Sequence, residues 1–89
     1  MEITYDQSKN LYNISNRNLS FEEVVNFDFE TASYTIDKRK DYGETRRRAI
    51  GYLGNRLYAL VFTETRNGIR VISFRKANKR EVIKYEQKN

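Results

Sequence analysis

Residues 46–76 read RRRAIGYLGNRLYALVFTETRNGIRVISFRK, and this stretch decides the fold. Three runs rich in β-branched and aromatic residues are separated by the dipeptides Gly54-Asn55 and Asn67-Gly68. Both dipeptides suit two-residue hairpin turns, because glycine and asparagine accept positive φ angles. The stretch therefore predicts a three-stranded antiparallel meander with strands at residues 46–53, 56–65 and 69–76.

The middle strand of this meander is apolar on both faces at residues 57–62, so both faces need cover. Upstream of the meander, Asp6 is a good N-cap for a helix through about Ser15, and Asn18 can stop this helix because asparagine tolerates the left-handed conformation. Leu11 and Ile14 are the clearest apolar positions of this helix. Short strands are expected at residues 3–5 and 32–36.

Two capping boxes predict further helices, because each places an N-cap residue three positions before a glutamate. Ser20 and Glu23 frame a short helix at residues 21–28, and Asn78 and Glu81 begin a C-terminal helix. The predicted fold class is α+β: N-terminal helices, a twisted antiparallel β-sheet with a C-terminal three-stranded meander, and a C-terminal helix. We expect one domain over residues 1–89.

The composition excludes several kinds of site. The chain has no cysteine and no histidine, so disulfides, thiolate zinc sites and histidine-based acid–base catalysis are excluded. No clustered acidic spacing indicates a bound metal, and no cofactor is expected. No apolar run approaches the about 20 residues that span a bilayer, and no secretory signal is visible. We therefore expect a cytoplasmic protein without a membrane contact.

Charge is divided unevenly along the chain. Residues 1–43 hold five Lys/Arg and eight Asp/Glu, whereas residues 44–89 hold twelve Lys/Arg and four Asp/Glu. The basic half indicates a polyanionic partner. The alternative is a basic surface that is only solvated.

Register places part of this charge on one face of the sheet. If Leu53 pairs with Arg56 and Arg66 with Ile69, one face carries a carboxylate and three guanidinium groups: Glu44, Arg46, Arg48 and Arg70. Such a cluster is a natural phosphate receptor. In the same register Ser73 and Arg75 fall on the opposite face, and nothing in the sequence shows a β-bulge that would re-aim them. The alternative is that the arginines pair with Glu44, Glu64 and Glu81.

An ordered set of short motifs runs along nearly the whole chain. The set consists of Y-D-x-x-K-N at residues 5–10, S-F-E-E at 20–23, G-E-x-R and A-I-G at 43–51, V-F-T-E at 61–64, I-R-V-I-S-x-R-K-A at 69–77, K-R-E at 79–81 and Y-E at 85–86. In this order the motifs resemble those of BrnT-type ribonuclease toxins of type II toxin–antitoxin modules, which are small relatives of the RelE-like fold. Members of that family usually carry K-H-G where this chain has Asn16, Arg17 and Asn18, so a histidine-dependent mechanism is untenable here.

The resemblance implies a toxin that cleaves RNA and thereby inhibits translation and growth. Its implied partner is a ribbon-helix-helix antitoxin, and DNA would be contacted only through that antitoxin. A homodimer or a toxin–antitoxin heterotetramer is the expected assembly. The competing function is a non-catalytic RNA-binding or ribosome-associated module.

Metal-independent RNA cleavage needs a base for the ribose 2′-OH and donors for the phosphorane oxygens. Glu44 is the candidate base, or else only an ion-pair partner of Arg46. The candidate phosphate ligands are Arg46 and Arg70, with Arg75 added by the resemblance. Neighbouring phosphates are expected to contact Arg48, Lys76, Lys79 and Arg80. Tyr58 and Tyr85 are expected either to stack on a base or to pack in the core.

Overall fold

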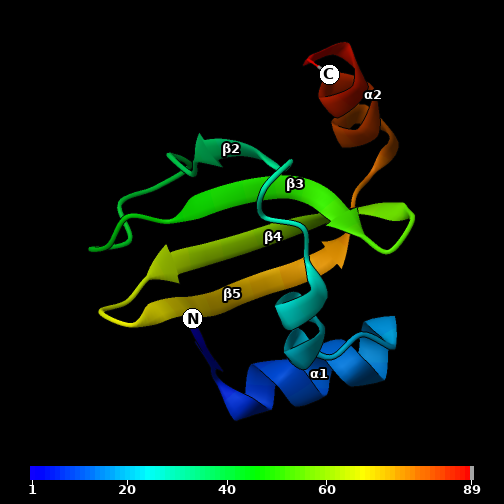
Figure 1. The fold of residues 1–89 in the computed structure, drawn as a ribbon. Helices are drawn as coiled ribbons and strands as arrows, with labels where there is room; N and C mark the ends of the chain where they lie inside the picture. The colour runs from blue at the N-terminus through cyan, green and yellow to red at the C-terminus, as the bar shows by residue number, and fades with distance from the viewer. Residues whose placement is uncertain (89) are drawn as a thin grey trace.

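The computed structural model describes residues 1–88. It shows a single β-sheet around which the rest of the chain is arranged (Figure 1). Five strands lie side by side in the order β1-β5-β4-β3-β2. They are β1 (Glu2–Tyr5), β2 (Ser33–Ile36), β3 (Arg47–Leu53), β4 (Arg56–Glu64) and β5 (Gly68–Lys76). The helices are α1 (Gln7–Arg17), the 3₁₀ helix η1 (Phe21–Asn26) and α2 (Lys79–Lys88). The α+β class with its C-terminal meander and final helix is confirmed, and it is compatible with a RelE-like fold.

The first hairpin of the meander has the predicted register. Leu53 pairs with Arg56 and Arg48 pairs with Val61, across a turn in which Gly54 has a φ of +64°. The second hairpin differs from the prediction. Glu64, rather than Arg66, pairs with Ile69, because the chain turns through residues 65–67 with the Thr65 N–H donating to the Gly68 carbonyl at 2.9 Å.

The sheet is mixed rather than wholly antiparallel. Strand β1 pairs in parallel with β5, from Glu2 opposite Gly68 to Tyr5 opposite Val71. The antiparallel prediction missed this pairing, because a four-residue strand at the start of the chain has no turn that fixes its partner. Beyond Val71 the outer edge of β5 therefore has no strand beside it within residues 1–88.

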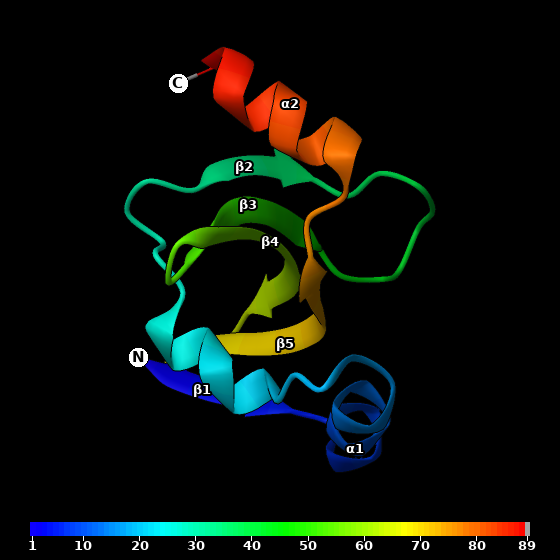
Figure 2. The same ribbon diagram turned by 90° about the vertical axis from the view of Figure 1, so that its right-hand side faces the viewer.

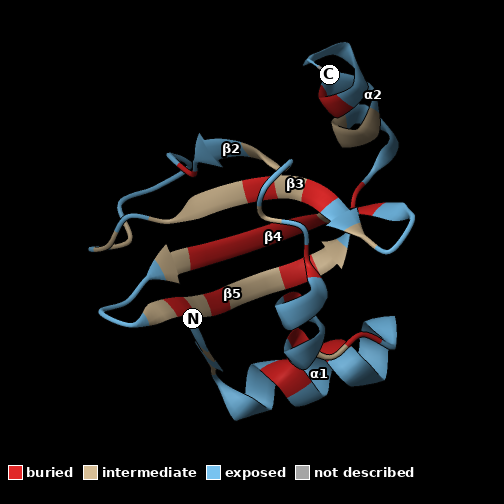
Figure 3. Cartoon of the chain, in the orientation of Figure 1, coloured by how far each residue is buried: buried red, intermediate tan, exposed pale blue. Residues whose placement is uncertain are grey.

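The two faces of the sheet are covered differently (Figures 2 and 3). Helices α1 and η1 lie near β5 and β1 against the main core, whose largest fully buried side chains are Phe74, Leu60, Val24 and Val71. Helix α2 lies on the other side of the molecule, where Tyr85 packs with Leu57 and Ala77. Neither α1 nor α2 is both long enough and apolar enough to cross a membrane.

Helix α1 meets the core through polar side chains. Its N-cap Asp6 and the left-handed Asn18 are as predicted, but the predicted apolar face is wrong: Leu11 is 64% exposed and Ile14 is 39% exposed. The buried positions are Asn10 and Asn13.

Asn13 explains this orientation of α1. Its Nδ2 donates to the Leu19 and Phe74 carbonyls, both at 2.9 Å. The Phe74 carbonyl belongs to the part of β5 that lies past the end of β1. A buried carbonyl without a partner is costly, so the asparagine side chain takes the place of a neighbouring strand there.

The loop between β2 and β3 is tied down at Asp37, which is buried. Its carboxylate accepts bonds from Arg39 Nε at 2.9 Å and Nη2 at 2.7 Å, and from the Tyr42 hydroxyl at 3.3 Å. The hydrogen bonds from Arg39 hold the pKa of Asp37 well below its usual range. The Asp37 carboxylate thus ties Arg39 and Tyr42 of the loop to the end of β2.

We predict that Asn13→Ala lowers the free energy of unfolding by about 2 kcal/mol, because two buried carbonyls lose their donor. Asn16→Ala is the matched control, since Asn16 Nδ2 donates only to the exposed Tyr12 carbonyl on the same helix. Urea unfolding at neutral pH measures both variants. Equal stability of the two variants would contradict the role of Asn13 in docking α1.

A second prediction concerns Asp37. Because its folded-state pKa is depressed, it contributes stability above its ordinary pKa of 3.8, and this is lost as the pH falls through the lowered value. Asp37→Asn is therefore expected to lower the unfolding free energy by about 1–2 kcal/mol at neutral pH, with the deficit shrinking in acid. Urea unfolding across pH, with the exposed Asp41→Asn as control, measures this; a deficit that is constant with pH would refute it.

Candidate functional site

A β-bulge in β5 determines which of its side chains share a face. Phe62 pairs with Val71, but Val61 pairs with Ser73, so Ile72 is an extra residue in β5. Before the bulge Ile69 and Val71 are buried, and after it Phe74 is buried. The alternation of the strand thus shifts by one residue.

The bulge overturns one prediction. Ser73 and Arg75 were expected on the face opposite Arg70, but the shifted alternation puts all three on the same face. This is the face of the sheet that points away from the main core, and we call it the open face. The available signal was the doublet Val71-Ile72, because two adjacent apolar residues interrupt a strictly alternating strand. Arg75 therefore joins Arg46 and Arg48.

These side chains surround a small depression that we call the arginine hollow. It encloses about 100 Å³. Its lining residues come from β3, β4, β5 and the β2–β3 loop: Arg39, Arg46, Arg48, Ala59, Val61, Ile72, Ser73 and Arg75. Four guanidinium-bearing residues thus meet over one part of the sheet. Sequence reasoning missed Arg39, because its position depends on the contact with Asp37 and not on strand register.

Glu44 joins two of the arginines. One carboxylate oxygen accepts a bond from Arg46 Nε at 3.0 Å and the other accepts one from Arg70 Nη2 at 2.8 Å. The predicted convergence of these three residues is therefore present. Hydrogen bonds from Arg46 and then Arg70 lower the pKa of Glu44, despite some desolvation. The Arg46 guanidinium also lies over the Tyr42 ring, 3.9 Å from its centroid, which limits its movement.

Glu81 holds Arg75. The pair is bidentate, with Arg75 Nη1 and Nη2 at 2.8 and 3.0 Å from the two carboxylate oxygens. The same carboxylate accepts the Asn78 N–H at 2.9 Å, and Asn78 accepts the Glu81 N–H in return, so the predicted capping box of α2 is confirmed. The pKa of Glu81 is lowered chiefly by the bond from Arg75, with Arg48 contributing at longer range.

The alternative interpretation of the arginines is also partly realised. Besides the pairs at Glu44 and Glu81, Arg47 pairs with Glu64 on the other face at 2.6 Å. Pairing does not neutralise the open face, however. Among the described residues, five arginines there (Arg39, Arg46, Arg48, Arg70 and Arg75) face three carboxylates (Asp37, Glu44 and Glu81), which leaves an excess of two positive charges.

Arg48 has an unmet hydrogen-bond donor. Its Nε is buried and has no protein partner within residues 1–88. A buried donor of this kind normally has an acceptor, so its place in the wall of the arginine hollow fits an incoming anionic oxygen.

The remaining predicted site residues lie apart from the arginine hollow. Lys76 lines a neighbouring hollow, and Lys79 and Arg80 lie beside Ile83 at the start of α2. The Tyr85 hydroxyl donates to the Thr31 carbonyl at 3.0 Å and the residue is buried, so Tyr85 belongs to the core. Tyr58 packs its ring on Phe74, with centroids 5.4 Å apart, yet stays partly exposed.

Comparison with known proteins assigns the chain to a family. The sequence model of a family described as the ribonuclease toxin BrnT of type II toxin–antitoxin systems matches residues 5–81. No curated protein gave a significant match. The matched segment contains the arginine hollow, Glu44 and Glu81, and the family description implies an RNA substrate and an antitoxin partner. The chain belongs to the BrnT family of ribonuclease toxins of type II toxin–antitoxin systems.

Proposed function

We propose that this toxin is an endoribonuclease that cleaves RNA at the arginine hollow without a metal ion. The observation that carries the proposal is the gathering of four arginines around the hollow, one of them with a buried Nε that lacks a partner within residues 1–88. Guanidinium groups fixed in this way supply the positive charge that a pentacoordinate phosphorus needs, and in a partly dry site they do so strongly.

In the proposed reaction the ribose 2′ oxygen attacks the adjacent phosphorus and the bond to the 5′ oxygen breaks. The products are a 2′,3′-cyclic phosphate and a 5′-hydroxyl end. Glu44 takes the proton of the 2′-OH, and solvent water returns one to the leaving oxygen. Because its pKa is lowered, Glu44 is ionised at neutral pH but is a weak base, so the rate depends mainly on charge stabilisation by the arginines.

The arginines have distinct parts in this proposal. Arg46 and Arg70 hold Glu44 at the attacking side and also contact the phosphate. Arg75 contacts the phosphate while Glu81 fixes its direction. Arg48 donates its free N–H to the phosphate oxygens. Lys76, Lys79 and Arg80 contact flanking phosphates, which makes binding dependent on salt.

The partner proteins are proposed from the family. A type II antitoxin binds its toxin directly, and we propose one of the ribbon-helix-helix class, with DNA contacted only through it. We also propose that the toxin forms a homodimer, or a heterotetramer with the antitoxin, and works in the cytoplasm. The excess positive charge of the open face supports an acidic antitoxin segment as the element that blocks the arginine hollow.

Arg46→Ala and Arg75→Ala are each expected to lower the cleavage rate about a hundredfold while the fold is retained, by analogy with the loss of one transition-state donor. The matched control is Arg66→Ala, at the exposed turn between β4 and β5, which removes the same charge away from the site. Gel analysis of labelled RNA in EDTA measures the rates. Parental rates in both site variants would refute the assignment, and RNA retention without cleavage by the parent would establish a non-catalytic binding module instead.

The pH dependence of kcat/KM tests Glu44. With a pKa below its ordinary value of 4.5, its acid limb should lie below that pH and the profile should be flat near neutrality. Glu44→Gln should lose most of the activity and the acid limb with it. If Glu44 is only an ion-pair partner, the variant keeps the parental profile.

A further inference from the structure

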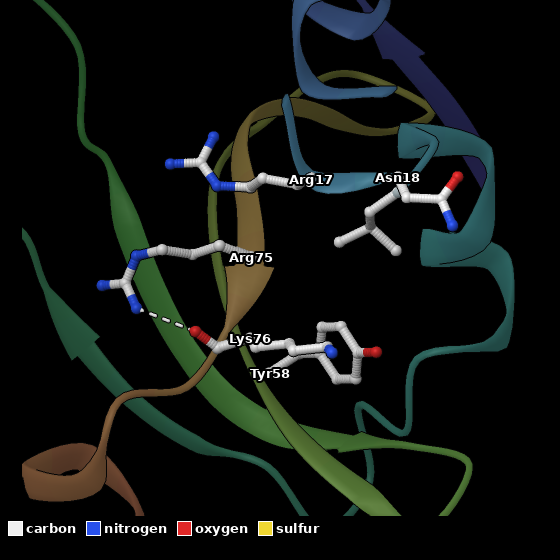
Figure 4. Close-up of a pocket in the computed structure, with 6 residues that line it drawn as sticks. Arg17, Asn18, Tyr58, Arg75 and Lys76 are labelled. Atoms are coloured by element: carbon white, nitrogen blue, oxygen red, sulfur yellow. Dashed lines mark hydrogen bonds between the residues drawn. The ribbon is translucent and has the colours of Figure 1, made fainter. Parts of the chain in front are cut away.

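A second basic hollow adjoins the arginine hollow and has no assigned role. It measures about 530 Å³ and is lined by residues from the end of α1 and from β4 and β5: Arg17, Asn18, Leu19, Tyr58, Arg75 and Lys76 (Figure 4). Arg75 lines both hollows, so its side chain is common to the two. No carboxylate is among the lining residues.

Arg17 is held in place by a buried side chain. Its Nη1 donates to Asn13 Oδ1 at 2.8 Å, and Asn13 is itself fixed to β5 through the Phe74 carbonyl. Arg17 forms no ion pair with any residue in the described part of the chain. In Figure 4 the side chains of Arg17 and Arg75 extend in the same direction from α1 and β5. Arg17 is thus a positioned cation whose remaining donors are free for a ligand.

The other wall of this hollow has a different chemistry. Tyr58 and Lys76 are cross-strand partners on β4 and β5. The Tyr58 ring packs on Phe74, and both Tyr58 and Lys76 line the hollow, as Figure 4 shows. Three cations that line one hollow with a partly exposed phenol suit a group that combines a phosphate with a sugar and a base.

We propose that this second hollow binds the nucleotide adjacent to the one whose phosphate is cleaved, in single-stranded RNA. Arg17 and Lys76 hold the phosphate of that nucleotide, and Tyr58 contacts its ribose or base. The inference rests on the proposed function, since it places a neighbouring nucleotide beside the scissile phosphate. Arg75 then lies between two successive phosphates, and its positive charge attracts both.

Binding of an RNA that cannot be cleaved tests the second hollow independently of catalysis. The probe is a fluorescein-labelled single-stranded hexanucleotide with 2′-O-methyl groups throughout, which lacks the attacking hydroxyl. Fluorescence anisotropy at several salt concentrations gives the affinity and its salt dependence. Arg17→Ala should weaken binding about tenfold and reduce the slope of log K against log salt by about 0.7, the value for one lost contact to a single strand.

Matched variants make this result specific. Arg66→Ala removes one arginine in the exposed turn between β4 and β5 and should bind as the parent does. Lys76→Ala gives a second measurement if Arg17→Ala fails to fold, because Lys76 is exposed and forms no ion pair in the described part of the chain. Equal binding by parent, Arg17→Ala and Lys76→Ala would overturn the proposal.

Cleavage assays separate this proposal from the proposed function. On a cleavable RNA, Arg17→Ala should raise KM more than it lowers kcat, whereas Arg46→Ala lowers kcat. If Arg46→Ala abolishes cleavage but Arg17→Ala matches the parent in KM and in binding, only the second hollow is refuted. If the parent binds the probe but never cleaves RNA, and Arg17→Ala still weakens binding, the proposed catalysis fails and the nucleotide site stands.

Discussion

The extra residue Ile72 lets β5 contribute side chains both to the core and to the basic open face. Val71 and Phe74 both reach the core although they are three residues apart, and Arg70 and Arg75 both reach the open face although they are five apart. In a regular strand neither pair could share a face, because side chains alternate with a period of two. The composition of the arginine hollow therefore depends on this single irregularity, and so does the presence of Arg75 in the walls of both hollows.

The carboxylates of the open face hold the arginines without neutralising them. Each acidic group there also has a structural role, since Asp37 fixes the β2–β3 loop, Glu81 caps α2, and Glu44 bridges the start of β3 to β5. Guanidinium groups pressed together would repel one another and weaken the fold. The three carboxylates reduce that repulsion and fix the directions of the N–H donors. Donors fixed in this way stabilise a transition state better than the same charges on flexible side chains.

The sequence predicted features that depend on local chemistry. The Gly54-Asn55 turn gave the correct register of the first hairpin, and the caps at Asp6, Asn18 and Asn78 are where their side-chain chemistry places them. The convergence of Glu44, Arg46 and Arg70 was also predictable, because the error in the second turn was two residues. A shift of two preserves the face on which each side chain lies.

Features that depend on distant contacts were not predictable from local patterns. The face of Arg75 depends on a bulge marked only by the Val71-Ile72 doublet. The orientation of α1 depends on a carbonyl of β5, sixty-one positions beyond Asn13, so apolar spacing along the helix gave the wrong buried side. Arg39 reaches the site through a loop whose path is set by one buried carboxylate.

Asn13 limits how this protein can change over evolutionary time. Its amide uses both N–H donors and its oxygen at once, on two backbone carbonyls and on Arg17. Aspartate would turn a negative oxygen toward two carbonyls, glutamine is one methylene too long for the same geometry, and serine lacks the second donor. A substitution of Asn13 would disturb both the docking of α1 on β5 and the position of the Arg17 side chain. The fold and the proposed RNA contact of Arg17 therefore depend on the same residue.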